Sequence, residues 1–294
     1  MFKILEKSDL AAQVYKYVVE APDIARKAEA GQFVILRLDE HGERFPITLA
    51  DWDSEKGTLT LFVQAVGKST IQMSRMTAGQ SIRDVVGPLG VPSHVEKSGT
   101  VVALGGGFGI AAIHPIVRAH TKIGNKTISI LGARTKNLLI LEEEMRKVSS
   151  EVRIATDDGS YGHKGFVTDI LKELLENKEP VSLVLAIGPM VMMQAVAGIT
   201  RPFGIKTLVS MNPIMMDGTG MCGACRVMVN GKMKFACVDG PEFDAHQVDF
   251  SGVLERLKVY QSEEKLSMDH YLRETKGECW LEQKLKTPQS PEGR

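Results

Sequence analysis

The chain has 294 residues and equal numbers of acidic and basic side chains, 36 of each, so its formal net charge is zero. This length is enough for two domains and a small third, and a hydrophobic content of 43% supports buried cores. A balanced charge without a basic cluster argues against a nucleic-acid binder. The most apolar stretch, residues 101–117, is too short and too rich in glycine to predict a membrane span.

Residues 1–97 have the pattern of an antiparallel β-barrel. Short segments rich in β-branched and aromatic residues occur at 14–20, 33–38 and 58–63, and Gly and Asp separate them. A single helical segment, residues 69–76, interrupts them. We therefore predict a barrel as the first domain.

Strands and helices alternate over residues 98–208. The predicted strands are 101–104, 127–131, 152–155 and 182–187, and the predicted helices are 111–121, 139–148, 166–176 and 191–199. This alternation predicts a parallel sheet with helices on both faces.

A glycine-rich loop joins the first of these strands to its helix. It contains Gly105, Gly106, Gly107 and Gly109, and residues 107–112 fit the pattern G-x-G-x-x-A. Such a loop lets a pyrophosphate approach the backbone at the start of a helix, so we predict a nucleotide site. An ordinary strand–helix turn is the alternative interpretation.

Two carboxylates, Asp157 and Asp158, follow the strand at 152–155. Carboxylates at this position can bind ribose hydroxyls, and they repel a 2′-phosphate. They favour NAD(H) over NADP(H) as the ligand. The alternative is that Asp157-Asp158-Gly159 only forms a turn.

Residues 209–245 carry three of the four cysteines. Cys222, Cys225 and Cys237 have the spacing of a plant-type 2Fe–2S loop, C-x4-C-x2-C…C, in which Asp217 takes the first position. An Asn230-Gly231 turn in the hairpin between Cys225 and Cys237 would bring Cys237 back to the loop. We predict a small cluster domain in which Asp217 and these three cysteines bind the iron.

Other interpretations of the cysteines remain. Zinc would need a second C-x2-C or a histidine pair, and His246 is the nearest histidine. A C-x-x-C redox pair does not account for Cys237 or for the glycines of the loop. Cys279 is the rival of Asp217 as the fourth ligand. Clustered cysteines without a disulfide pattern indicate a reducing compartment, and the N-terminus has no secretion signal, so we expect a cytoplasmic protein.

The order of barrel, nucleotide sheet and cluster loop resembles the ferredoxin–NADP reductase superfamily. Within it, the Gly-x-Gly-x-Cys-Gly-x-Cys signature is similar to that of dihydroorotate dehydrogenase B electron-transfer subunits. Asp217 and the longer tail resemble the small subunits of NADH-dependent ferredoxin:NADP+ oxidoreductases, also called sulfide dehydrogenases. The alternative within the superfamily is the dihydroorotate dehydrogenase B subunit itself.

The resemblance implies FAD between the barrel and the nucleotide domain. Arg44, Pro46, Ile47 and Thr48 correspond to the flavin motif R-x-Y-[ST], although Phe45 takes the arginine position and Arg44 precedes it by one residue. A second flavin segment spans residues 63–70, and its expected FAD-binding residues are Val63, Gln64, Ala65, Ser69 and Thr70.

The resemblance also implies the function. FAD would exchange hydride with NAD(H), and the cluster would pass single electrons to a larger flavin and 4Fe–4S subunit in a heterodimer. That partner would handle NADP(H) and ferredoxin, and the complex would bifurcate electrons. The C-terminal extension, residues 246–294, is polar without a clear core pattern from residue 250, and with Tyr260, Tyr271 and Trp280 it would contact the partner. A zinc-bound, non-enzymatic interaction module is the alternative of another class.

Overall fold

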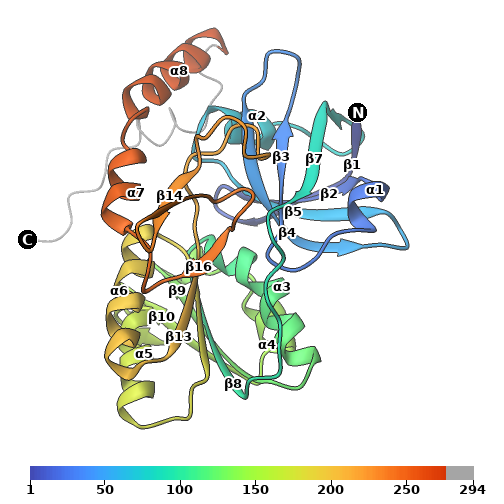
Figure 1. Cartoon of the computed structure of the whole chain (residues 1–294). Coiled ribbons are helices and arrows are strands. Elements are labelled where there is room, and N and C mark those ends of the chain that lie inside the picture. The colour runs from blue at the N-terminus through green and yellow to red at the C-terminus, as the bar shows by residue number, and fades with distance from the viewer. Residues whose placement is uncertain (276–294) are drawn as a thin grey trace, which may run out of the picture.

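The computed structural model describes residues 1–275, which form a β-barrel and an α/β half, with the cysteine-rich segment and two C-terminal helices alongside them (Figure 1). Cys279 and Trp280 lie outside the described residues. Among residues 1–275, no helix is both long and apolar enough to cross a bilayer.

The first part is a nearly closed antiparallel barrel, as predicted. Its strand order is β6-β1-β2-β5-β4-β3-β7, and only Arg83 separates β6 from β7, so the two edges of the sheet approach each other. The short helix α1 and the helix α2, which was predicted at 69–76, lie outside the sheet. The bounds are β1 Phe2–Ala11, β2 Val14–Glu20, α1 Pro22–Ala25, β3 Phe33–Arg37, β4 Arg44–Asp53, β5 Thr58–Gln64, α2 Lys68–Ser74, β6 Ser81–Ile82 and β7 Asp84–Leu89.

The second part confirms the predicted sheet of parallel strands between helices. Its order is β11-β10-β9-β8-β12-β13-β16, and only β16 runs antiparallel to its neighbour. The bounds are β8 Thr100–Gly106, α3 Gly109–Lys122, β9 Lys126–Ala133, η1 Lys136–Leu138, α4 Glu142–Val148, β10 Glu151–Thr156, β11 His163–Lys164, α5 Val167–Glu176, β12 Leu183–Ile187, α6 Met190–Thr200, η2 Arg201–Phe203, β13 Lys206–Ser210 and β16 Glu242–Asp244.

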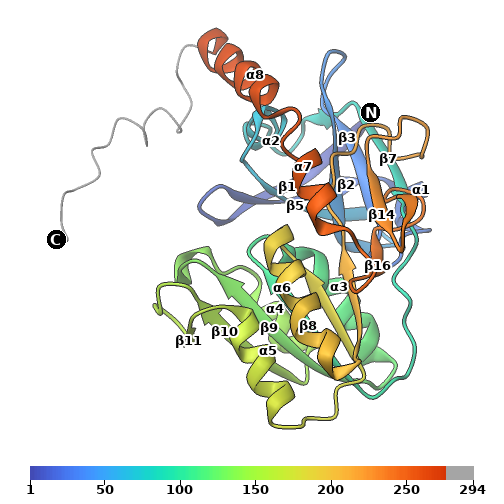
Figure 2. The same ribbon diagram turned by 60° about the vertical axis from the view of Figure 1, so that its left-hand side comes forward.

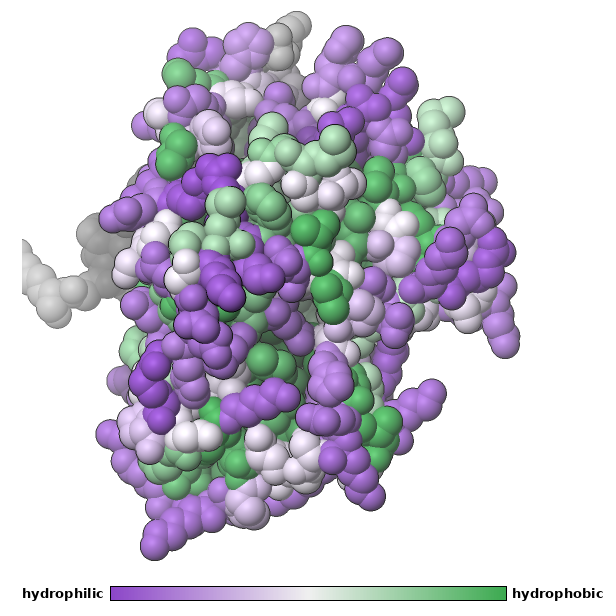
Figure 3. Space-filling model, viewed as in Figure 1, coloured by the Kyte–Doolittle hydropathy of each residue, from purple (hydrophilic) through white to green (hydrophobic). Residues whose placement is uncertain are grey.

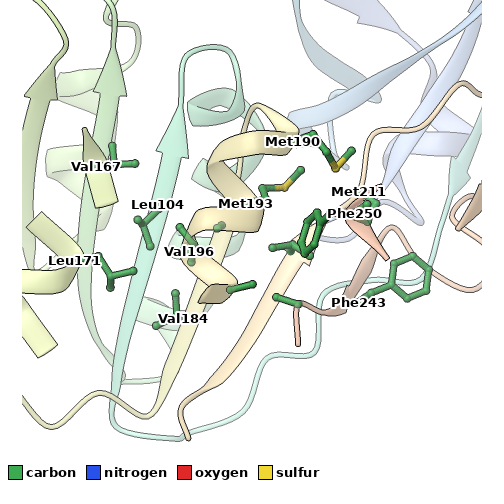
Figure 4. Close-up of a cluster of buried hydrophobic side chains, with 14 of the residues drawn as sticks. Leu104, Val167, Leu171, Val184, Met190, Met193, Val196, Met211, Phe243 and Phe250 are labelled. Carbon is green, nitrogen blue, oxygen red and sulfur yellow. The ribbon is translucent and has the colours of Figure 1, made fainter. Parts of the chain in front are cut away.

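Alternating residues of the central strand β8 face opposite helical layers, as the two-residue period of a strand requires. Val101 and Ala103 pack with α3 and α4, whereas Val102 and Leu104 pack with α5 and α6. Figure 4 shows the second layer, in which Met190, Met193 and Val196 of α6 point toward the sheet. The sheet is thus buried on both faces, and only its strand ends are open for a ligand.

The cysteine-rich segment contains the predicted hairpin, formed by β14 Arg226–Val229 and β15 Lys232–Phe235. Asn230 and Gly231 have φ values of 50° and 70°, which a type I′ turn requires at both central residues. The next strand, β16, pairs with β13 and so joins this segment to the nucleotide sheet. The proposed boundary at 208/209 falls inside β13, so we propose the cluster domain as a segment that shares this sheet.

Two helices follow, α7 Phe250–Arg256 and α8 Gln261–Glu274 (Figure 2). The expectation that residues 250 onward lack a core pattern is wrong for α7. Phe250 and Val253 are 5% and 1% exposed and pack against the hairpin and α6. Polar neighbours on the exposed face of α7 conceal this short apolar pair in the sequence.

Candidate functional site

A cavity of about 970 Å³ lies between the barrel and the nucleotide sheet, large enough for a dinucleotide-sized ligand. The barrel contributes Pro46, Ile47 and Thr48 of β4 and Gln64 at the end of β5. Figure 3 shows apolar side chains gathered across the middle of one face, where the barrel and the α/β half meet. The two halves thus build one site.

The glycine loop forms the opposite wall. Gly106, Gly107 and Gly109 line the cavity, and Gly109 begins the 14-residue helix α3. A Cβ on Gly109 would lie 2.2 Å from the carbonyl oxygen of Ile187, so no larger residue fits between α3 and β12. Gly105, which directly precedes Gly106, is buried against Ile110 and does not line the cavity.

The two predicted carboxylates have different surroundings. Asp157 lines the cavity together with Arg134, which directly follows β9. Asp158 does not line it, and its carboxylate accepts a hydrogen bond from the Ser160 N–H at 2.9 Å. Hydrogen bonds from the Ser160 hydroxyl and the Ser160 N–H hold the pKa of Asp158 below its ordinary value. Asp158 therefore stabilises the turn, and of the two carboxylates only Asp157 lines the cavity.

The second flavin segment lies next to the cavity and contributes Gln64 to its wall. Val63 is 0% exposed, because alternate side chains of β5 point into the barrel, and Ala65, which follows β5, is 1% exposed and packs against Ile71 of α2. Thr70 accepts hydrogen bonds from the N–H groups of Val66 and Gly67 and so shapes the start of α2. The side chains of Val63, Ala65 and Thr70 thus serve the barrel and the turn.

Arg44 and Ser69 also lie outside the cavity lining. Ser69 Oγ donates to Glu43 Oε2 at 2.6 Å, and the Lys68 ammonium is 3.3 Å from the same carboxylate. Arg44 is exposed at the start of β4, and after the hydrogen bonds from the Thr219 and Cys222 N–H groups its charge is a further, smaller cause that lowers the pKa of Asp217. The segment around Arg44 therefore lies toward the cluster loop.

The predicted metal ligands form two pairs. Cys225 Sγ and Cys237 Sγ are 3.2 Å apart and almost fully buried. Asp217 lies beside Cys222, because its Oδ2 accepts a hydrogen bond from the Cys222 N–H at 2.8 Å. The Asp217 Oδ1 also accepts from the Thr219 N–H at 2.9 Å, and these two donors hold the pKa of Asp217 below its ordinary value.

This arrangement fits a two-iron cluster. Tetrahedral zinc requires four ligands around one ion, whereas a 2Fe–2S cluster takes two ligands on each iron. Burial and the neighbouring Cys225 thiol raise the pKa of Cys237, and a bound metal ion would favour its thiolate form.

The cluster loop packs directly on the barrel. A Cβ on Gly218 would lie 2.6 Å from Leu89 Cδ1 and 2.8 Å from Ile35 Cγ1. Met215, two residues before Asp217, lines the interdomain cavity. The ligand pairs therefore lie next to the cavity, which suits electron transfer between two bound groups.

The sequence patterns missed several residues of the cavity. These residues lie at the carboxyl ends of strands or in the first turns of helices, where ligands of parallel sheets bind. Their position after each predicted strand is the signal that could have identified them. They include Arg134, Phe166, Thr168, Val191, Met192, Ser210 and Asn212.

Comparison with known proteins agrees with both halves of this site. A family model for the iron-sulfur cluster binding domain of dihydroorotate dehydrogenase B matches residues 212–249. A model for the oxidoreductase NAD-binding domain matches residues 103–198. The chain therefore has an NAD-binding domain followed by an iron–sulfur binding domain.

Relatives match almost the whole chain. A Thermotoga maritima homolog of the dihydroorotate dehydrogenase B (NAD(+)) electron transfer subunit is 46% identical over 276 residues, which are 94% of this chain and 97% of the relative. The Fusobacterium nucleatum dihydroorotate dehydrogenase B (NAD(+)) electron transfer subunit is 32% identical, and the match covers 83% of this chain and 96% of that subunit.

A solved structure of an NADH-dependent reduced ferredoxin-NADP oxidoreductase, studied for flavin-based electron bifurcation, has a chain of 44% identity. The two superimpose with a TM-score of 0.87 over 92% of this chain and 98% of that chain. The chain belongs to the family of dihydroorotate dehydrogenase B electron-transfer subunits and their homologues.

Proposed function

We propose that this chain is the FAD and 2Fe–2S subunit of an electron-bifurcating, NADH-dependent ferredoxin:NADP+ oxidoreductase. In this proposal it exchanges hydride with NAD(H) and passes single electrons to a larger subunit that carries flavin and 4Fe–4S clusters. That partner exchanges electrons with ferredoxin and NADP(H). The thiolate ligands suit a reducing compartment, and we place the protein in the cytoplasm.

One observation carries the proposal. The cavity is lined by the predicted flavin segment of the barrel, by the glycine loop of the nucleotide sheet and by residues 210–215 leading into the cluster loop. A hydride donor, a flavin and an electron exit thus share one connected site. This arrangement supports conversion between two-electron and one-electron transfer.

The residues of the barrel and sheet bind and orient the reactants. When bound, FAD takes up two electrons as a hydride and releases them singly, and a 2Fe–2S cluster carries one electron. Pro46 and Ile47 give an apolar wall that excludes water, and Thr48 and Gln64 supply polar contacts. The backbone of Gly107 and Gly109, at the start of α3, suits the pyrophosphate of NAD(H).

In this proposal, the electron leaves the chain through the two pairs of cluster ligands. In the proposal, Cys225 and Cys237 hold one iron, and Asp217 with Cys222 holds the other. Cys222 is exposed, whereas Cys225 and Cys237 are buried. The Asp217–Cys222 side therefore lies nearer to a docked acceptor.

Asp217 favours the oxidoreductase over a dihydroorotate dehydrogenase B assembly, because it stands in the place of a cysteine. Chain length fits both assemblies: the oxidoreductase chain matches 92% of this chain, and the Thermotoga homolog of the dihydroorotate dehydrogenase B subunit matches 94%.

Co-purification tests the proposal. We expect the chain, isolated anaerobically, to contain flavin, iron and sulfide, and to bring with it a larger flavin and 4Fe–4S subunit. We expect the complex to reduce NADP+ with NADH and reduced ferredoxin together. Recovery of a dihydroorotate-oxidising partner would favour the alternative assembly, and zinc in a colourless protein would contradict both.

A further inference from the structure

The C-terminal helix α7 makes a direct contact with the predicted ligand loop. Arg256 Nη2 donates a hydrogen bond to the backbone oxygen of Ala224 at 3.0 Å. Ala224 lies between Cys222 and Cys225, and its N–H points to Cys222 Sγ at 3.5 Å. Arg256 therefore contacts the residue whose N–H points to a ligand sulfur.

Arg256 projects from a helix whose start is fixed. Asp249 caps α7 by accepting the Gly252 N–H at 3.1 Å, and the Asp249 N–H donates to the Met228 oxygen at 2.9 Å. Phe250 and Val253 are buried beneath the helix. The helix backbone cannot move away from the hairpin without breaking these contacts, so the guanidinium is held near the loop.

The chain beyond Arg256 is also anchored, on the flavin half. Met268, Tyr271 and Leu272 of α8 pack against Ala65 and Ile71 of the barrel segment. In addition, the Arg75 guanidinium lies 5.1 Å from the Tyr271 ring centroid, and Ser267 Oγ donates to Glu43 Oε1 at 3.3 Å. Both ends of the segment that carries Arg256 are therefore tied to the rest of the molecule (Figure 2).

The charges around the loop give Arg256 an electrostatic effect. Arg226, next to Cys225, is a second guanidinium here, with Nη1 3.0 Å from the Cβ position of Gly223, and the charge of Arg44 acts on Asp217 from the barrel side. Asp249 lies with Arg226 and Arg256 along a small cavity of about 200 Å³, but its carboxylate is used by the Gly252 N–H. A cation beside the loop stabilises added negative charge there.

We propose that Arg256 is a positioning residue for the cluster, which holds the Cys222–Cys225 backbone and makes the cluster easier to reduce. This inference rests on the proposed 2Fe–2S function. Because α8 is anchored on the flavin half, Arg256 also links the loop to the side from which electrons arrive. Its removal should change the electronic surroundings of the cluster even where the iron stays bound.

The test compares three variants of the full-length protein with its cofactors. Arg256→Gln removes the charge, Arg256→Lys keeps a charge and a donor, and Arg273→Gln removes one charge from an exposed position on α8. We would measure iron and sulfide content, the EPR spectrum of the reduced cluster, and the fraction of reduced cluster in an anaerobic redox titration.

We expect Arg256→Gln to change the EPR line shape and to lower the reduced-to-oxidised ratio at a fixed potential by at least about threefold. The reduced-to-oxidised ratio of Arg256→Lys should lie between those of Arg256→Gln and wild type, and Arg273→Gln should match wild type in both the ratio and the EPR line shape. An unchanged Arg256→Gln, an equal shift in Arg273→Gln, or loss of iron from both Arg256 variants would overturn the inference. Wild-type protein without iron and sulfide would instead refute the proposed function.

Discussion

The loop after β8 and the loop before β14 are both rich in glycine, but their glycines serve different physical needs. In the first loop, Gly109 is required because a Cβ would collide with the Ile187 oxygen at 2.2 Å. In the second, Gly218 and Gly220 have φ values of 76° and 83°, which L side chains rarely adopt. Gly109 is thus required by packing alone, whereas Gly218 combines a positive φ with close packing on Leu89 and Ile35.

The difference indicates how each loop is stabilised. The packing of α3 on β12 is complete in the polypeptide itself, so the nucleotide loop keeps its form without a ligand. Cys225 and Cys237 are buried thiols at 3.2 Å, and we propose that their loop depends on iron. Damage to one loop should therefore leave the other intact.

The largest expected effect comes from Cys237→Ser, which breaks the cluster loop alone. We expect complete loss of the 2Fe–2S absorbance and EPR signal, because a hydroxyl is a poor ligand for this iron. NADH-driven flavin reduction should stay within about twofold of wild type, since Cys237 does not line the nucleotide cavity. A variant that retained stoichiometric iron and sulfide would remove Cys237 from the ligand set.

Gly109→Ala is the converse experiment. The added Cβ should lower the free energy of unfolding by about 1–3 kcal/mol through overpacking, and weaken NADH binding at least about tenfold by displacing the start of α3. Denaturant unfolding and NADH titration would measure both. Gly198→Ala is the matched control, because nothing lies within 4 Å of its Cβ position on α6, and it should be neutral or slightly stabilising. Unchanged NADH affinity in Gly109→Ala would contradict the role given to this loop.

The neighbouring carboxylates Asp157 and Asp158 should differ in their effect on the preference between NADH and NADPH. Asp157→Ala should raise the kcat/KM for NADPH relative to NADH by roughly tenfold, because a charge that repels the 2′-phosphate is removed beside Arg134. Asp158→Ala should leave this ratio unchanged, since its carboxylate binds the Ser160 N–H. Equal effects of the two substitutions would show that Asp157 does not select the nucleotide.

The smallest expected effect concerns β16, the strand that joins the two regions. Burial raises the pKa of Glu242 above its ordinary value, although the Ser93 hydroxyl donates to it. A raised carboxyl pKa contributes stability that is present below the unfolded value and lost as pH rises through the folded value.

We therefore expect Glu242→Gln to raise the urea midpoint at pH 8 and to match wild type near pH 4.5, because Gln keeps an acceptor for Ser93. Urea unfolding at several pH values would measure this difference. A Gln variant that is less stable at pH 8 would show that the charged form is favoured in the fold.

Much of the architecture could be predicted from local patterns. The strand–helix alternation of the nucleotide half and the Asn230-Gly231 turn depend on neighbouring residues, and the structure has them. The strand β1 was not predicted, because polar residues interrupt its apolar positions. The burial of Phe250 and Val253 was also missed, since it depends on the hairpin and α6 that pack above them.

The site was predictable only in part, for the same reason. Gly106, Gly107, Gly109 and Thr48 line the cavity, but Gly105 and Asp158 serve packing and a turn. The motif spacing does not tell which of two adjacent residues faces a cavity. The contact of Arg256 with Ala224 joins residues 32 positions apart, and no local pattern predicts it.

An anaerobic titration of the purified chain with NADH tests the central claim most directly. We expect the purified chain to contain bound flavin, iron and sulfide. On addition of NADH, the flavin absorbance should bleach and the EPR signal of a reduced 2Fe–2S cluster should then appear. NADPH should be much less effective. A protein that binds zinc without flavin, or one whose cluster stays oxidised while NADH fully reduces the flavin, would contradict electron transfer from nucleotide to cluster through this chain.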